Sequence, residues 1–274
     1  MPRFFVEAVL SPETDRTEIV GPDARHIKDV LRLRPGSELT VCDGARSDLL
    51  CTIESIQGDR VTLTIIKRSP NDTEPAFFAT LYQGLPKGDK FDLIIQKSVE
   101  LGAGRIVPMI CERSIAKVSA SDTARKIQRW NRIAQEAAKQ CGRGLVPTVT
   151  EPVSFAQAVA DVAGQTTSND TAFIPYEGER AMSLRQFLET AVPIPEKRSP
   201  RDIPESRSRD EVYGVEQRPS ISFLIGPEGG FSPAEMSLAE SNRIQTVSLG
   251  RRILRTETAS LAVLAMLGYH FDEF

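Results

Sequence analysis

From Ala76 to the C-terminus the sequence alternates between short apolar runs with strand character and longer segments with helical periodicity. Such alternation is typical of a mostly parallel sheet with helices packed on it, so we predict an α/β domain over residues 76–274. The expected strands are 77–85, 105–110, 171–176, 221–226 and 246–250. The expected helices are 89–101, ended by Gly102, then 122–141 and 256–271.

Residues 1–70 have a different pattern, with β-branched residues in partly alternating order over 3–10, 37–44, 49–56 and 60–66. The tripeptide Gln57-Gly58-Asp59 between the last two runs predicts a tight hairpin turn. One helix is expected from Pro22, with an apolar stripe formed by Ile27, Val30 and Leu31. The polar, proline-bounded residues 71–75 are predicted to be the linker between this β-rich module and the α/β domain.

Composition restricts the class of protein. No apolar run approaches the roughly 18 residues of a membrane span, and the N-terminal run lacks the character of a signal peptide, so we expect no membrane association and a cytoplasmic location. Two histidines and four widely spaced cysteines give little support for a metal site, and none is predicted. The charged, proline-rich stretch 193–220 is predicted to be a disordered surface insertion.

The net charge of −3 excludes a protein that binds nucleic acid through global positive charge. Between Gln83 and Leu145, however, twelve basic residues stand against six acidic ones, which is +6 there and −9 for the remainder. A polyanion is therefore expected to dock on this segment, although an ordinary solvated helix face would have a similar composition.

The segment from Leu224 to Glu235 is the most specific local feature. A buried strand ends at Gly226, a loop with three glycines follows, and Ser232, Pro233 and Glu235 form a helix start with a capping box. Glycines at the carboxyl end of a strand let the backbone approach a ligand closely, although a plain tight turn has the same composition. Glu228 would repel a phosphate, which favours a cationic ligand or one that offers hydroxyl and amine groups.

A second loop has the same design. The strand that ends at Gly250 is followed by a basic segment, and Thr256 is predicted to cap the last helix, with Glu257 in its first turn. Arg255 stands at the junction of loop and helix. It is placed to contact an anion or a developing negative charge, or to pair with an acid such as Glu228.

The motifs GPEGGFSPAE and VSLGRRILRTETA resemble those of the SPOUT-class methyltransferases, specifically the ribosomal RNA uridine-N3 methyltransferases that modify the 16S RNA of the small subunit. KGDKFDLIIQKSVELG, CERSIAK, RWNRIAQEAAKQCGR and HIKDVLRLRPG are similar to segments of that family in the same order. The resemblance covers nearly the whole chain except 193–220. It implies a PUA-like RNA-binding β-barrel followed by an α/β domain with a deep trefoil knot, and a homodimer.

The resemblance further implies S-adenosylmethionine as the cofactor and 16S ribosomal RNA, within the assembled small subunit, as the partner. The residues that would hold the cofactor are Leu224, Gly226, Pro227, Glu228, Gly229, Leu249, Gly250, Ile253, Leu254 and Thr258. The residues that would grip RNA phosphates are Lys87, Lys97, Arg113 and Arg143.

The chemistry implied is removal of the uridine N3 proton and in-line methyl transfer. Arg255 would stabilise the charge that develops on the uracil oxygens, and Glu228, Glu257 or solvent would take the proton. Two alternatives stay open: a methyltransferase that acts on another RNA base or position, and a non-enzymatic RNA-binding assembly factor.

Overall fold

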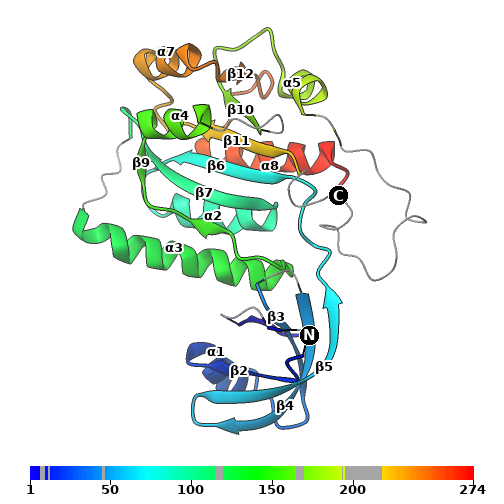
Figure 1. The fold of residues 1–274 in the computed structure, drawn as a ribbon. Helices are drawn as coiled ribbons and strands as arrows, with labels where there is room; N and C mark the ends of the chain where they lie inside the picture. Colours follow the sequence, from blue (N-terminus) through cyan, green and yellow to red (C-terminus); the bar gives the residue numbers. More distant parts are fainter. Residues whose placement is uncertain are drawn as a thin grey trace. The chain divides into compact units, whose positions relative to one another are not determined.

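The computed structural model describes residues 1–6, 10–11, 13–44, 47–114, 120–164, 170–192, 194 and 218–274. These residues form two compact units (Figure 1). The first holds Met1–Glu74 together with Ala138–Val146, and the second holds the rest of the described chain from Pro75 onward. Most of the predicted insertion, residues 193 and 195–217, lies outside the described residues. Its predicted end at 220 is wrong, because Arg218 is buried and donates to the carbonyl of Pro75, and a strand begins at Ser220.

The first unit is built on a five-stranded sheet. Its strands in spatial order are β1 (Arg3–Phe5), β3 (Glu38–Cys42), β4 (Ser47–Gln57), β5 (Arg60–Pro70) and β2 (Arg16–Val20). The hairpin between β4 and β5 turns at Gly58, where φ is 61°, as the sequence predicted. The sequence did not reveal β2, although its alternating exposed and buried residues are the expected signal for a half-buried strand.

The helical segment of this unit differs from the expectation. Helix α1 (Pro22–Arg25) continues into a π-helical turn, His26–Val30, in which the N–H of Leu31 donates to the carbonyl of His26. Ile27 is buried as predicted, but Val30 is 69% exposed and Leu31 is 36% exposed. The predicted apolar stripe is wrong because the wider π turn rotates the residues that follow Ile27 away from the face that an α-helix would bury.

The segment predicted as a polar linker, 71–75, is exposed at Asp72 and Thr73 but has buried residues on either side of them. Asn71 and Glu74 are each only 4% exposed. The carboxylate of Glu74 pairs with Arg143 at 2.7 Å and also accepts the N–H groups of Gly144 and Leu145, each at 3.1 Å. A charge inside a protein is tolerated only with such partners, so these residues attach the segment around Arg143 to the first unit.

The second unit is a parallel sheet with helices on both faces. Its path in space is β12 (Gln245–Val247), β10 (Asp170–Pro175), β11 (Ser220–Ile225), β6 (Phe78–Gly84), β7 (Ala103–Ile110) and β8 (Thr148–Val149), and β9 (Val153–Ser154) also pairs with β7. Every pairing is parallel, which confirms the predicted α/β class. The carboxyl ends of the strands therefore lie at one edge of the sheet, where ligands of such sheets bind.

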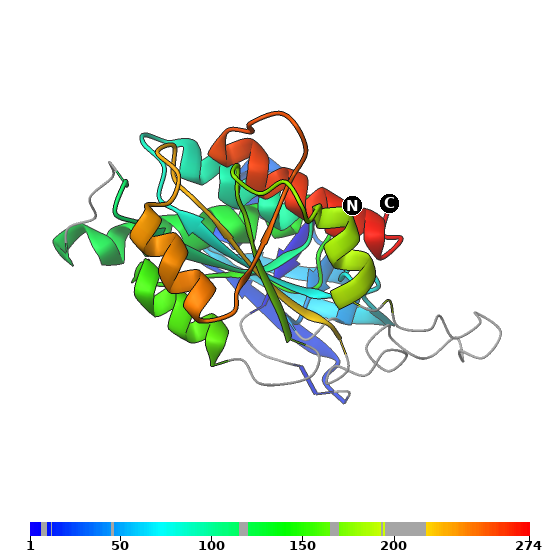
Figure 2. The ribbon, with the colours of Figure 1, turned by 90° about the horizontal axis from the view of Figure 1, so that it is seen from above.

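Helices cover both faces of this sheet (Figure 2). On one face lie α4 (Phe155–Ala163) and α7 (Pro233–Ser241), and on the other lie α2 (Lys90–Glu100) and α8 (Thr256–His270). The remaining helices are α3 (Ala120–Cys141) and α5 (Leu184–Ala191). Gly102 follows the last turn of α2 with φ of 91°, which explains why that helix ends there. No helix in the described part of the chain is long and apolar enough to cross a membrane.

Candidate active site

The start of α8 is joined to the end of β11 by the side chain of Thr256. Its hydroxyl donates to the carbonyl of Gly226 at 2.6 Å and accepts from Nε2 of Gln83 at 2.8 Å. Thr256 therefore does not cap α8 as predicted. The residue in the N-cap position is Arg255, which makes no capping hydrogen bond through its side chain. The end of β6, the loop after β11 and the start of α8 thus meet at one buried contact.

Gly84, at the end of β6, makes this close approach possible. A Cβ atom there would lie 2.5 Å from the backbone nitrogen of Pro227 and 2.8 Å from the carbonyl carbon of Gly226. No real side chain tolerates such distances to backbone atoms, so only glycine fits at this position. The loop after β11 is consequently packed directly against the backbone of β6.

The far side of the glycine-rich loop is held by the start of α7. Ser232 and Glu235 form the predicted capping box, with Ser232 Oγ accepting from the Glu235 N–H. The Glu235 carboxylate also accepts the N–H of Glu112 at 2.8 Å, which brings the segment after β7 against the loop. From that segment Arg113 donates to the carbonyl of Gly229 at 3.1 Å. Arg113, predicted to grip RNA, therefore also holds the glycine-rich loop.

The two candidate catalytic carboxylates share one ammonium group. Lys90 Nζ lies 3.0 Å from Glu228 Oε1 and 3.5 Å from Glu257 Oε2. The N–H of Lys87 also reaches both oxygens of Glu228, at 3.2 and 3.3 Å. Glu228 thus pairs with Lys90 and not with Arg255, whose exposed guanidinium has no charged partner among the described residues.

The pKa of Glu228 follows from these contacts. Partial burial by itself raises it, but the hydrogen bonds from Lys90 and from the backbone outweigh that effect, and the pKa lies below its ordinary value. A carboxylate with a lowered pKa is a weaker proton acceptor. The structure therefore argues against Glu228 as the general base, one of the three possibilities that the sequence left open.

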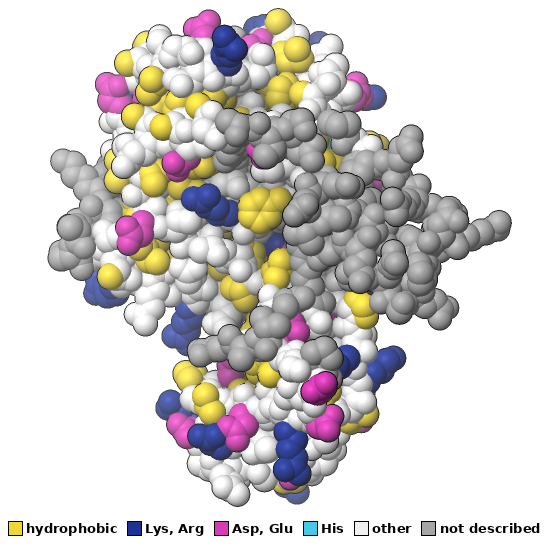
Figure 3. Space-filling view, in the orientation of Figure 1, with side chains coloured by type: hydrophobic (Ala, Val, Ile, Leu, Met, Phe, Trp, Pro, Cys, Tyr) yellow, Lys and Arg dark blue, Asp and Glu magenta, His cyan; other side chains and the backbone are white. Residues whose placement is uncertain are grey.

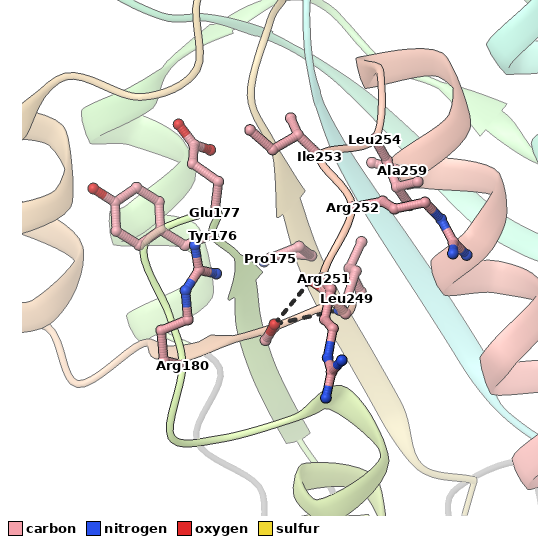
Figure 4. A pocket seen from close by; sticks show the side chains of 12 residues that line it. Pro175, Tyr176, Glu177, Arg180, Leu249, Arg251, Arg252, Ile253, Leu254 and Ala259 are labelled. Carbon is pink, nitrogen blue, oxygen red and sulfur yellow. Dashed lines mark hydrogen bonds between the residues drawn. The ribbon is translucent and has the colours of Figure 1, made fainter.

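A hollow opens beside these loops, at the carboxyl ends of β10 and β12 (Figure 4). Four of the residues predicted to hold the cofactor line it, namely Leu249, Gly250, Ile253 and Leu254. Gly250 has φ of 111°, a conformation that favours glycine, and its N–H donates to Ser248 Oγ at 3.3 Å. The other six do not line this hollow: Leu224, Gly226, Pro227, Glu228, Gly229 and Thr258.

The opposite wall of the hollow comes from the segment after β10, which sequence reasoning missed. Tyr176, Glu177 and Arg180 line it. The Glu177 carboxylate lies close to Gly230, since Oε1 would be 3.4 Å from a Cβ atom there. The signal was present, because Tyr176-Glu177-Gly178 is another strand end followed by a glycine.

Glu179 fixes the shape of that wall. Its carboxylate accepts from the hydroxyl of Thr246 at 2.7 Å and from the N–H groups of Ala181 and Met182 at 2.6 and 3.1 Å. These hydrogen bonds, that from Thr246 foremost, lower the pKa of Glu179 to about 2. The segment after β10 is thereby tied to β12, the strand that leads into the other wall.

We compared the chain with models of known protein families. The family model of the RNA methyltransferase domain matches residues 73–268. The family model of the RNA methyltransferase PUA domain matches residues 20–66. The chain belongs to the RNA methyltransferase family. Its second unit contains nearly all of the methyltransferase domain, and its first unit contains the PUA domain.

Relatives within the RNA methyltransferase family match over the full length. The Bacillus subtilis ribosomal RNA small subunit methyltransferase E is 30% identical over 99% of this chain and 98% of its own length. The Neisseria gonorrhoeae protein of the same name, solved bound to S-adenosyl methionine, is 31% identical, with a TM-score of 0.77 over 98% of this chain and 97% of that one. A putative methyltransferase from Legionella pneumophila, in complex with bound cofactor SAM, is 28% identical, with a TM-score of 0.74 over 97% and 96%.

The residues predicted to grip RNA are in different environments in this RNA methyltransferase family member. The prediction for Arg143 is wrong, because its side chain is 6% exposed and pairs with Glu74 inside the first unit. Lys97 is half-exposed and pairs with Glu100 one turn along α2. The side chain of Lys87 is exposed, and only its backbone N–H is engaged, by Glu228.

The local charge count also overstated the basic surface. Besides Arg143, two counted residues pair with acids outside the segment: Lys139 with Asp23 and Lys90 with Glu228. On the face drawn in Figure 3, the described basic and acidic side chains are interspersed and not grouped by sign.

Proposed function

We propose that this chain transfers a methyl group from S-adenosylmethionine to N3 of a specific uridine in the 16S ribosomal RNA of the small subunit. The observation that carries the proposal is the hollow at the carboxyl edge of a parallel sheet, between Leu249–Leu254 and Tyr176–Arg180. Membership of the RNA methyltransferase family, and relatives named for methylation of small-subunit RNA, support the substrate. The relative bound to S-adenosyl methionine supports the cofactor.

The lining of the hollow fits that cofactor chemically. Leu249, Ile253 and Leu254 offer apolar contact for an adenine ring, and the open backbone at Gly250 lets polar groups approach closely. Glu177 offers a carboxylate that would accept from ribose hydroxyls or from an ammonium group. The bound sulfonium supplies an already activated methyl group, so what is left to the protein is placement and proton removal.

The methyl acceptor must lose a proton first. Neutral N3–H of uridine has no free lone pair, so attack needs deprotonation, which a nearby positive charge favours. We assign that charge to Arg255, whose exposed guanidinium stands at the first turn of α8, free of the acids that engage Lys90. Glu228 and Glu257 are both engaged by Lys90, and we assign the proton to solvent.

RNA contact is assigned to exposed basic side chains of both units. In the first unit Arg25, Lys28, Arg32 and Arg34 are exposed around the π-helical turn that also exposes Val30. Positive charge beside an apolar side chain is suited to unpaired RNA, whose phosphates and unstacked bases are both available. In the second unit Lys87 and Arg113 take this role, with Lys97 when it releases Glu100.

Four further features of the family are proposed for this chain. The sheet of the first unit closes into a β-barrel, and the segment containing α8 threads a deep trefoil knot. The chain acts as a homodimer, which the exposed apolar side chains of Ile253, Met266 and Tyr269 on and before α8 support. A cytoplasmic location follows from the ribosomal substrate.

The experiment is a transfer assay with isotope-labelled S-adenosylmethionine and small subunits from cells that lack this enzyme. The proposal predicts label in one nucleoside, identified by mass spectrometry as N3-methyluridine, and a loss of about 100-fold or more in rate for Arg255→Ala. Label in another nucleoside would favour a different target. If the chain binds RNA but neither binds S-adenosylmethionine nor transfers a methyl group, the result would favour a non-enzymatic assembly factor.

A further inference from the structure

Three segments of the second unit meet around the ammonium group of Lys90. Lys90 begins α2, Glu228 belongs to the glycine-rich loop after β11, and Glu257 lies in the first turn of α8. Both carboxylates lie within 3.5 Å of the same nitrogen. The site described above assigns no role to Lys90.

We infer that Lys90 is a positioning residue for the cofactor: its ammonium holds the glycine-rich loop and the start of α8 in the arrangement that cofactor binding requires. The inference rests on the proposed function, because it concerns the same hollow. Lys90 does not line that hollow and acts through the two segments that it joins.

The first argument is electrostatic. Two carboxylates held near each other repel, and the repulsion is strong where burial limits solvation. The side chain of Glu257 is only 18% exposed, and its Oε2 is buried without a hydrogen-bond partner among the described residues, so the nearby ammonium is its compensation. Removing that ammonium leaves two partly buried negative charges facing each other.

The second argument is connectivity. The segment that contains Glu257 begins directly after Leu249–Leu254, one wall of the hollow. The loop that contains Glu228 also contains Gly230, which lies beside Glu177 on the other wall. Through its ion pairs with Glu228 and Glu257, Lys90 therefore joins segments connected to both walls of the hollow.

The third argument is that no other observed contact of Glu228 can replace the positive charge of Lys90. The N–H of Lys87 still reaches Glu228, but it carries no net charge and does not reach Glu257. Among the residues that the structure describes, the charged groups found at Glu228 are Lys90 of α2 and, on the same ammonium, Glu257 of α8. The hydrogen bond from Lys90 is the largest of the contributions that lower the pKa of Glu228, so without Lys90 this pKa rises relative to the wild type.

The test is calorimetric titration of the full-length chain with S-adenosylmethionine, without RNA, at several pH values. We expect Lys90→Met to weaken binding by about fivefold or more at pH 7, and Lys90→Arg to stay within about twofold of the wild type. Lys67→Met, which removes one exposed lysine charge from β5 of the first unit, is the matched control and should bind as the wild type does.

The pH profile separates positioning from a general loss of structure. In the wild type the Lys90 ammonium keeps Glu228 ionised under mildly acidic conditions. In Lys90→Met, acidification that protonates Glu228 removes its repulsion with Glu257, so binding should recover toward that of the wild type as the pH is lowered. Adding Glu228→Gln to Lys90→Met removes one of the two facing charges, so the double variant should bind better than Lys90→Met at pH 7 and should lack this dependence on pH. If Lys90→Met does not fold, Lys90→Gln carries the same test.

The outcomes are distinct. Equal affinities and identical pH profiles for wild type, Lys90→Met and Lys67→Met would overturn the inference while leaving the proposed function intact. Failure of the wild type itself to bind S-adenosylmethionine would overturn the proposed function, and this inference with it.

Discussion

The hydroxyl of Thr256 donates a 2.6 Å hydrogen bond to the carbonyl of Gly226, and this contact joins the first residue of α8 to the end of β11. The two glycine-containing loops that the sequence singled out, thirty residues apart, are thereby adjacent in space. Because Gln83 donates to the same hydroxyl, the end of β6 belongs to the same junction.

Thr256→Val should remove the hydrogen bonds of this junction while keeping a side chain of similar volume. The substitution leaves the buried Gln83 amide without one acceptor and the Gly226 carbonyl without its donor, which costs about 1–3 kcal/mol of unfolding free energy. Chemical denaturation measures the loss. Thr256→Ser, which keeps the hydroxyl, should recover most of it, and equal losses for both variants would show that the hydrogen bonds are not the cause.

Gly84→Ala should be more destabilising than an ordinary glycine substitution. A methyl group would meet backbone atoms of Gly226 and Pro227 that cannot move independently, so we expect a loss of about 1–3 kcal/mol and weaker cofactor binding. Gly58→Ala is the comparison, because it has open space around it and a cost of about 1 kcal/mol that arises from its positive φ alone. A smaller loss at Gly84 than at Gly58 would contradict the packing argument.

Glu179→Gln tests a pH-dependent tie near the hollow. The folded-state pKa of about 2 lies below the unfolded value, so the stabilisation is present above the unfolded pKa and is lost as the pH falls toward 2. At pH 7 the variant should lose about 1 kcal/mol of unfolding free energy, and the difference from wild type should shrink with acidification. A stability difference between wild type and Glu179→Gln that stays constant from pH 7 to low pH would contradict this assignment.

Arg143→Ala should affect folding and not RNA contact. It leaves the Glu74 carboxylate buried without its ion-pair partner, which costs about 3 kcal/mol or more. Arg34→Ala, an exposed site on the first unit, should instead leave stability nearly unchanged and reduce the salt dependence of RNA binding. Chemical denaturation and RNA titrations at several salt concentrations check both variants. Unchanged stability for Arg143→Ala, or a large loss of stability for Arg34→Ala, would contradict these assignments.

Periodicity and turn residues predicted most of the fold. The parallel sheet, the hairpin at Gly58 and the capping box at Ser232 all follow from local patterns that tertiary contacts did not override. The exposure of Val30 could not be predicted, because a π turn has no distinct periodic signal in a sequence. The burial of Arg143 could not be predicted either, because the sequence does not show whether a basic residue is solvated or paired with a distant acid.

The site was predictable only where a loop carried its own signature. Leu249 and Gly250 are the last residues of the predicted strand that ends in glycine, and they do line the hollow. The role of Thr256 was misassigned because helix-capping rules consider only local backbone partners, whereas its hydroxyl finds an acceptor thirty residues away. Lys90 carried no signal, since the two acids that it joins become neighbours only through the sheet topology.

The most direct test of the central claim is mass-spectrometric mapping of methylated nucleotides in 16S ribosomal RNA from cells with and without the gene. The account predicts that one uridine carries a methyl group on N3 only when the gene is present, and that a gene encoding Arg255→Ala leaves most copies unmodified. Identical modification patterns in the two strains, or a difference at a base other than uridine, would contradict it.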